Sequence, residues 1–322
     1  MNARRRLLIA LSAAALPAFA QKKTFVIGYL SPVVPPDNRL EAFRQGMRDH
    51  GYVEGRDYRL EMRWGEGKLD RMPALAAEIV KLKPDIIVAR SSPSVLAAKK
   101  ATNTIPIVMP LSSDPVGDGI VASLAHPGGN ITGLSLMAPE LEAKRLQLLH
   151  DVLAKRPGKV SVLWNPSYTG MAARFRETKV AAPHVGMDIR SVEMRDAREM
   201  EAAFEAISRD PPAGIVLLVD PLTFSMKARI VEFAREKRIP AIYEQREFAD
   251  AGGLISYGPN SDAQFRRAAY YVDRILKGAK PGDLPIEQPV KIELIVNLGT
   301  ARTLGITIPQ SILANADQVI DN

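Results

Sequence analysis

The stretch that decides the fold class is IPIVMPLSSDPVGDGIVASLAHPGGNITG, residues 105–133. It opens with the apolar run Ile105 to Met109, passes through the polar turn Ser112-Ser113-Asp114-Pro115, and then has the apolar spacing of a helix from Val116 to Leu124. This order of strand, polar loop and helix is a β-α unit. In an open α/β sheet the loops after the strands form the ligand crevice, and N–H groups at a helix start attract anions. The turn is therefore a candidate ligand contact, although capping of the helix alone also explains its composition.

Short apolar runs alternate with amphipathic segments along the rest of the chain. In the first half the spacing predicts strands at 24–30, 58–64, 85–89 and 105–109, and helices at 38–50, 70–82 and 93–101. In the second half it predicts strands at 159–164, 188–193, 214–219 and 239–243, and helices at 170–182, 197–208 and 223–237. A run of β-α units favours an α/β fold in which a mostly parallel sheet has helices on both faces.

The two halves resemble each other, which predicts two lobes. Each half ends with a similar motif, Thr104-Ile105-Pro106-Ile107-Val108 in the first and Arg238-Ile239-Pro240-Ala241-Ile242 in the second. The alternative is one doubly wound sheet, which would need more than about ten strands and is unusual for that reason. Three further segments, 131–136, 254–258 and 283–290, are expected to cross between the lobes, and a helix at 262–277 separates the last two.

Four segments carry a family resemblance: the block from Ser112 to Gly133, VIGY at 26–29, GYVEG at 51–55 and IELIVN at 292–297. In their order along the chain they resemble the bacterial ABC-transporter substrate-binding proteins, the group that includes tryptophan- and tyrosine-binding proteins. The resemblance implies a type I periplasmic binding fold, with two Rossmann-like lobes, each a mostly parallel sheet flanked by helices, joined by three hinge crossings. It implies lobe 1 at 21–134 and 255–284, lobe 2 at 135–254 and 285–322, and an ABC permease of the inner membrane as partner.

The first twenty residues have the three parts of a signal peptide in order. Arg4-Arg5-Arg6 is the positive region, Leu7 to Leu16 the apolar region, and Ala18-Phe19-Ala20 the cleavage motif. The apolar region is too short to span a bilayer, which needs about 20 residues. We therefore expect cleavage after Ala20 and export to the periplasm, by either the Sec or the twin-arginine route. The chain contains no cysteine, so we expect no lipid anchor, disulfide or thiolate metal site.

The charge balance and the missing motifs exclude several function classes. The net charge of +7 falls to +4 without the three leader arginines, and the basic residues are scattered, which argues against a nucleic-acid partner. The chain has no G-x-S-x-G or G-x-x-x-x-G-K-[ST] motif, and Gly117-Asp118-Gly119 falls inside an expected helix. The four histidines are far apart in the sequence, and Glu140-Leu141-Glu142 has the pattern of a charged helix face. We expect no enzyme activity, no cofactor, no metal site and a monomer.

Polar and aromatic residues follow the expected strands of both halves. Those of the first half are hydroxyls and one acid, and with the helix-start N–H groups they suit a ligand carboxylate. Those of the second half include two acids that suit an ammonium group and a tyrosine that suits an apolar or aromatic side chain. There are competing interpretations. The serines and Asp220 could cap helices, and Glu244 could be a solvated surface charge. The candidates are Ser31, Ser91, Ser92, Ser112, Ser113 and Asp114 in the first lobe, and Asn165, Tyr168, Asp220 and Glu244 in the second.

These patterns and the resemblance together predict an exported, non-catalytic solute-binding protein. It would trap a small carboxylated ligand, an amino acid or an aromatic acid-like compound, between its two lobes and deliver it to an ABC permease. Two alternatives stay open. One is a periplasmic sensor of the same fold that feeds a receptor or kinase, and the other is an exported Rossmann-type enzyme.

Overall fold

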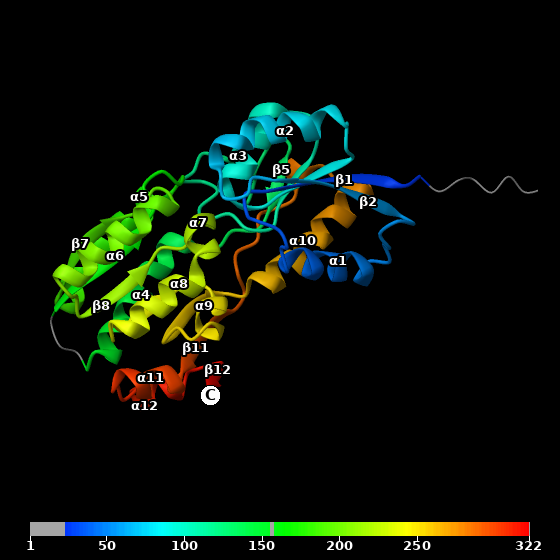
Figure 1. Ribbon diagram of the computed structural model, residues 1–322. Helices are drawn as coiled ribbons and strands as arrows, with labels where there is room; N and C mark the ends of the chain where they lie inside the picture. Colours follow the sequence, from blue (N-terminus) through cyan, green and yellow to red (C-terminus); the bar gives the residue numbers. More distant parts are fainter. Residues whose placement is uncertain (1–22, 155–157, 322) are drawn as a thin grey trace, which may run out of the picture.

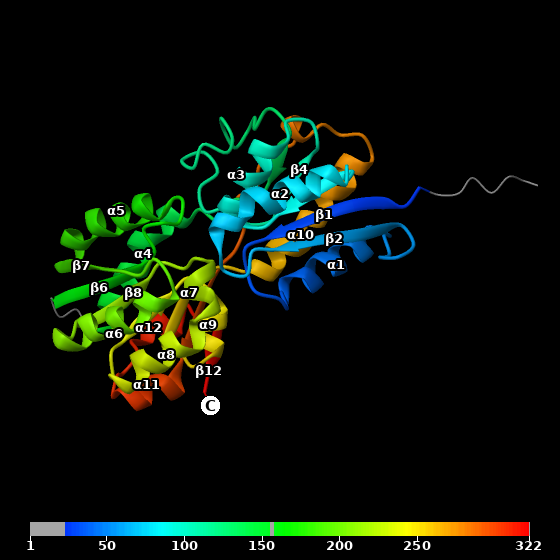
Figure 2. The same cartoon turned by 45° about the horizontal axis from the view of Figure 1, so that its top comes forward.

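Two α/β units lie side by side in the computed structural model, which describes residues 23–154 and 158–321 (Figure 1). A second view shows the units as separate bodies with a narrow junction between them (Figure 2). The predicted signal peptide and its cleavage site lie outside the described residues. Within the part that the structure describes, no helix is both long and apolar enough to cross a membrane.

The first unit is a five-stranded sheet in the order β2-β1-β3-β4-β5, and all its neighbouring strands are parallel. Alternate strand residues point to opposite faces of the sheet. Ile27 and Tyr29 therefore pack with the helices α1 and α10, whereas Leu30 packs with α2 and α3. The elements are β1 (Phe25–Ser31), α1 (Arg39–Asp49), β2 (Tyr58–Trp64), η1 (Leu69–Arg71), α2 (Met72–Lys81), β3 (Ile86–Ala89), α3 (Ser91–Ala101), β4 (Ile107–Met109), β5 (Ile131–Gly133) and α10 (Ser261–Leu276).

The second unit is a seven-stranded sheet in the order β12-β11-β10-β9-β8-β6-β7. Only β10 and β11 are antiparallel among its described neighbours. Its two faces carry separate cores, one with α4 and α5 and one with α6 and α8. The elements are α4 (Ala138–Val152), β6 (Gly158–Trp164), α5 (Met171–Ala181), η2 (Ala182–Val185), β7 (Met187–Glu193), η3 (Ala197–Glu199), α6 (Met200–Arg209), β8 (Gly214–Leu217), α7 (Pro221–Ser225), α8 (Lys227–Glu236), β9 (Ala241–Tyr243), α9 (Arg246–Asp250), β10 (Ile255–Pro259), β11 (Ile292–Asn297), α11 (Leu298–Leu304), α12 (Gln310–Leu313) and β12 (Gln318–Ile320). The short helix η4 (Pro281–Asp283) belongs to the first unit, where Gly128 N donates to the Gly282 carbonyl.

The chain passes between the units three times: between β5 and α4, between β10 and α10, and between η4 and β11. The first and third crossings run side by side, because Ser135 N donates to the Glu287 carbonyl at 2.9 Å and Glu287 N to the Gly133 carbonyl at 3.1 Å. The expected lobe boundary at residue 255 differs from the strand pairing. Strand β10 pairs with β9 and β11 of the second sheet, and the chain returns to the first unit only at α10, which packs against α1.

Three local expectations were wrong. The expected helix from Val116 to Leu124 is a series of turns, because it contains two glycines and Gly119 has a φ of 68°, which a helix does not allow. The expected helix at 223–237 is two helices, α7 and α8, which meet at Met226. The expected charged face at 140–142 is only partly exposed, since Glu142 is fully buried.

Candidate ligand-binding site

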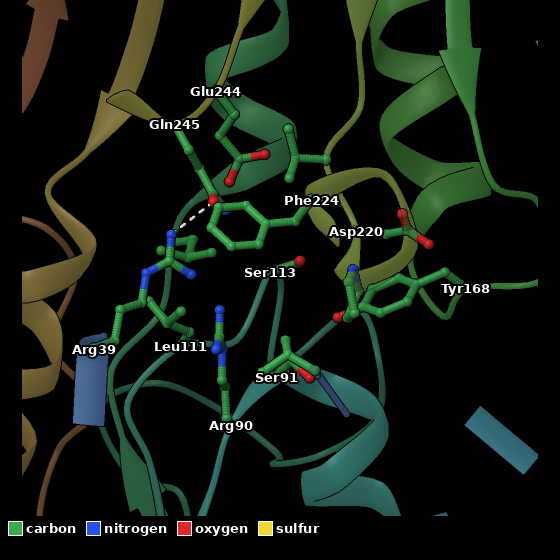
Figure 3. A pocket seen from close by; sticks show the side chains of 14 residues that line it. Arg39, Arg90, Ser91, Leu111, Ser113, Tyr168, Asp220, Phe224, Glu244 and Gln245 are labelled. Atoms are coloured by element: carbon green, nitrogen blue, oxygen red, sulfur yellow. Dashed lines mark hydrogen bonds between the residues drawn. The ribbon is translucent and has the colours of Figure 1, made fainter. Parts of the chain in front are cut away.

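A cavity lies between the two units, at the carboxyl ends of the parallel strands of both sheets. The space inside it that a water-sized molecule can occupy is about 40 Å³, so the two walls lie close together. Figure 3 shows side chains from both units converging on this space. The lining residues are Val33, Arg39, Arg90, Ser91, Leu111, Ser113 and Leu136 from the first side, and Tyr168, Val219, Asp220, Pro221, Phe224, Glu244 and Gln245 from the second.

Half of the ten residues predicted from the sequence line this cavity. They are Ser91, Ser113, Tyr168, Asp220 and Glu244. Each lies shortly after a different parallel strand: β3, β4, β6, β8 and β9. The carboxyl ends of parallel strands meet at one edge of their sheet, so residues far apart in the sequence come together there.

Three of the other predicted residues are buried beneath the cavity wall. The Ser31 hydroxyl is 3.5 Å from Val33 N and accepts its hydrogen bond. The hydroxyls of Ser92 and Ser112 are 3.2 Å apart and hydrogen-bond to each other. These serines join the loops that carry Ser91 and Ser113, so they support the wall but do not line it.

The remaining two predicted residues also act on their neighbours. Asp114 Oδ1 accepts a hydrogen bond from Gly117 N at 2.8 Å, which stabilises the turn that replaces the expected helix. Asn165 Nδ2 donates to Asp220 Oδ2 at 2.7 Å, and both side chains are buried. Asn165 thus orients a lining carboxylate without lining the cavity itself.

Arg90 is a lining residue that the sequence analysis did not select. It follows β3 and is 4 % exposed, and its Nη1 is 2.5 Å from Asp37 Oδ2. The Tyr29 hydroxyl donates to the same Asp37 oxygen at 2.6 Å. Arg90 directly precedes Ser91, so the rule that found Ser91 would also have found this residue. Its charge is paired within the first unit.

Arg39 is the second lining arginine and begins α1. Its Nη2 donates to Gln245 Oε1 at 2.7 Å and to Glu247 Oε1 at 2.6 Å, and both acceptors belong to the second unit. Its Cζ lies 4.7 Å from the ring centroid of Phe224, which is also in the second unit. Arg39 therefore connects the two walls of the cavity. No feature of the sequence points to this role, because a single arginine at a helix start is common.

Asp220 both caps a helix and lines the cavity. Its Oδ1 accepts hydrogen bonds from Thr223 N at 2.7 Å and from the Thr223 hydroxyl at 2.8 Å, so it is the N-cap of α7. Its Oδ2 accepts the bond from the neutral Asn165 amide, so all described hydrogen-bond partners of Asp220 are neutral donors. Among residues 23–154 and 158–321, no Lys, Arg or His side chain forms an ion pair with it. Burial raises the pKa of the Asp220 carboxyl, because the charged form loses hydration.

Glu244 ends a chain of four buried charges. Its Oε2 is 2.6 Å from Arg174 Nη2, and the same nitrogen is 2.6 Å from Glu142 Oε1. Arg145 Nη1 is 2.8 Å from that Glu142 oxygen. Burial acts to raise the pKa of Glu244, but the guanidinium groups of Arg174 and Arg145 outweigh it, so the pKa is lowered. Glu244 is thus an ionised wall residue whose charge is already balanced.

The rest of the lining is apolar or aromatic. Tyr168 is buried, and burial raises the pKa of its hydroxyl, so the ring stays neutral. Phe224 has Arg39 on one side, with Lys227 Nζ at 5.0 Å and Arg90 Cζ at 5.9 Å from its ring centroid. Within the described part of the chain, no group of three His, Asp or Glu side chains is suited to hold a metal ion.

The family model for ABC transporter substrate binding proteins matches residues 36–320. The chain belongs to this family. It is 26 % identical over 285 residues to the tyrosine-binding protein of Clostridioides difficile (strain R20291), covering 88 % of this chain and 81 % of that protein.

Solved structures extend the comparison to the fold. A conserved domain protein from Vibrio cholerae O1 biovar El Tor superposes with a TM-score of 0.85 at 28 % identity, over 92 % of this chain and 100 % of the other. The ABC domain from Streptococcus pneumonia in complex with L-Trp has a TM-score of 0.84 at 24 % identity, with the same coverage. The type I periplasmic binding fold expected from the sequence is therefore confirmed, with its two sheets and its family.

Proposed function

We propose that this substrate-binding protein captures a small zwitterion, an amino acid with an apolar or aromatic side chain portion, between its lobes and delivers it to an ABC permease. One observation carries the proposal. The second wall holds Asp220, a buried carboxylate that has only neutral donors as described partners. A buried carboxylate without a cation is costly, and a ligand ammonium group supplies that cation.

Ser91 and Ser113 offer hydroxyl donors for the ligand carboxylate from the first wall. Ser91 is the first residue of the eleven-residue helix α3, where the helix dipole favours negative charge. It also has a φ of 72°, a conformation that is rare outside glycine and concentrates at ligand clamps. These features support a carboxylate site at the start of α3.

Tyr168 and Phe224 support contact with the ligand's carbon skeleton. Both rings line the cavity from the second wall, and Leu111 and Leu136 line it from the first. Aromatic rings prefer offset-stacked or edge-to-face contact with other rings. The names of two relatives, a tyrosine-binding protein and a complex with L-Trp, agree with a ligand of this type.

Export and closure complete the proposed cycle. The leader at residues 1–20 directs the chain to the periplasm and is removed after Ala20. We divide the described chain into lobe 1, with the five-stranded sheet and α10, and lobe 2, with the seven-stranded sheet. The ligand enters while the lobes are apart, and the contacts of Arg39 with Gln245 and Glu247 form when they close. The protein binds its ligand without changing it.

Calorimetry on the purified chain from Gln21 onward tests this function. A thermal-shift screen of the common L-amino acids, with L-tryptophan and L-tyrosine as first probes, should identify a ligand, because binding to the folded state raises the melting temperature. Isothermal titration then measures the affinity, and NMR of the released ligand should find it unchanged. If no amino acid shifts the melting temperature, or if the ligand is turned over, the proposed function is wrong.

A further inference from the structure

The order of the strands in the second sheet sets the order of the lining residues along the second wall. Neighbouring strands run β9-β8-β6, about 5 Å apart. Gln245 follows β9, Asp220 follows β8 and Tyr168 follows β6. Asp220 thus lies between Gln245 and Tyr168 in this order, and Figure 3 shows it on the same side of the cavity as Tyr168, with Gln245 and Arg39 on the other side. From Asp220, the direction away from Tyr168 leads across the cavity to Gln245 and Arg39.

The Arg39 guanidinium group has N–H donors that make no described hydrogen bond. A guanidinium group has five N–H donors. The described hydrogen bonds of the Arg39 side chain use only Nη2, which donates to Gln245 and Glu247. Its Nε is buried and has no hydrogen-bond partner among the described residues, and the whole residue is only 3 % exposed. A buried donor without a partner is costly, and this arginine borders the cavity.

We propose that Arg39 is a specificity-determining residue that binds an oxygen acceptor at the far end of the ligand side chain and, through Nη2, also holds the lobes together. This inference rests on the proposed function. It narrows the ligand class to amino acids whose side chain ends in a hydroxyl, carboxamide or carboxylate. It also links recognition to closure, because the guanidinium group that meets the side chain is the one that bridges the lobes.

Paired probes that differ only in the terminal oxygen test the recognition. L-Tyrosine is compared with L-phenylalanine, and L-glutamine with L-leucine, on the wild-type chain and on Arg39→Gln. We expect the wild type to prefer the oxygen-bearing member of the pair that it binds by roughly tenfold or more, because a site built around a hydrogen bond rejects the analogue that lacks it. We expect Arg39→Gln to lose this preference. Arg44→Gln is the matched control, because Arg44 is on the same helix, pairs with Glu54 and does not line the cavity.

A distance measurement between the lobes tests the second role. The chain has no cysteine, so Lys100→Cys and Lys237→Cys, both exposed and on different lobes, accept two fluorophores cleanly. Energy transfer without ligand should report a smaller closed fraction in Arg39→Gln than in the wild type. Glu247→Gln weakens only the contact of Arg39 with the second lobe. It should therefore lower the closed fraction and reduce the affinity for both members of a probe pair by the same factor.

The outcomes separate the two proposals. If the wild type binds no amino acid, the proposed function fails, and the ligand-free distances still decide whether Arg39 holds the lobes closed. If the wild type binds a ligand and Arg39→Gln keeps the same ratio between paired probes, the inference about the side chain is overturned. An unchanged closed fraction in both Arg39→Gln and Glu247→Gln overturns the inference that Arg39 holds the lobes together. Circular dichroism and the melting temperature confirm that each variant is folded.

Discussion

Replacing Asp220 by asparagine tests the central electrostatic argument. The substitution keeps the size of the side chain, and asparagine is also a good helix N-cap, so the hydrogen bond from Thr223 N to Oδ1 persists. The bond from Asn165 Nδ2 to Oδ2 then faces an amide nitrogen, unless one of the two side chains turns over. The weakened hydrogen bond costs about 1–2 kcal/mol in the free energy of unfolding, and removal of the unpaired buried charge offsets part of this cost, so the variant should stay folded.

The effect on binding should be larger than the effect on stability. Removing one partner of a buried, hydrogen-bonded charge pair costs about 2–5 kcal/mol, and a value of about 3 kcal/mol corresponds to roughly 150-fold in affinity. Isothermal titration with the best amino acid from the screen measures this loss. Asp210→Asn is the control, because Asp210 is exposed and pairs with Lys159 and Arg190 away from the cavity.

A ligand analogue makes the test specific for the ammonium group. The deaminated propionate form of the same ligand lacks the cation, so Asp220→Asn should change its affinity by less than about threefold. Equal losses for the amino acid and its deaminated analogue would mean that Asp220 shapes the cavity without pairing with the ligand. Wild-type affinity in Asp220→Asn would refute the ammonium assignment altogether.

Three further predictions follow from the buried groups. Burial raises the pKa of the Asp220 carboxyl above the usual aspartate value. Its carboxylate is therefore protonated as the pH falls toward that raised value, and the affinity for an ammonium ligand should decline with it, whereas Glu244, whose pKa is lowered, stays ionised to lower pH. Calorimetry from neutral to acidic pH that finds constant affinity would contradict this. Arg174→Met leaves Glu142 and Glu244 without their shared partner and should lower the free energy of unfolding in urea by about 3–5 kcal/mol. The control Arg176→Met, on the exposed side of α5, should lower it by less than about 0.5 kcal/mol. Similar urea midpoints for the two variants would show that the buried charge network contributes little to stability. Gly46→Val places a Cβ against the Arg266 carbonyl where α1 packs on α10. The free energy of unfolding should fall by about 1–3 kcal/mol, which lowers the melting temperature by several degrees. An unchanged melting temperature would argue against this close approach of the two helices.

Only some of the residues that line the site could be predicted from the sequence, for a physical reason. Strand-end residues such as Ser113 and Asp220 were found because apolar runs mark strands and the next polar residue marks the sheet edge. Arg39 lies on a helix, and its partners Gln245 and Glu247 are more than 200 positions away. No periodic signal reports a contact at that separation. Glu142 was misjudged for the same reason, since its partner Arg174 is on a different helix.

The sequence by itself determined most of the alternating strands and helices at 24–109 and 159–243, the two-lobed α/β class and the family, because these depend on short-range periodicity and on contiguous motifs. It failed at residues 116–124, where apolar spacing suggested a helix and the glycines made turns. Tertiary structure alone decided which charges are paired and which are available, because burial and the pairing of Arg174 with Glu244 depend on how the helices and lobes pack. That packing leaves Asp220 as the lining acid with no described cation and Arg39 as the bridge between the walls.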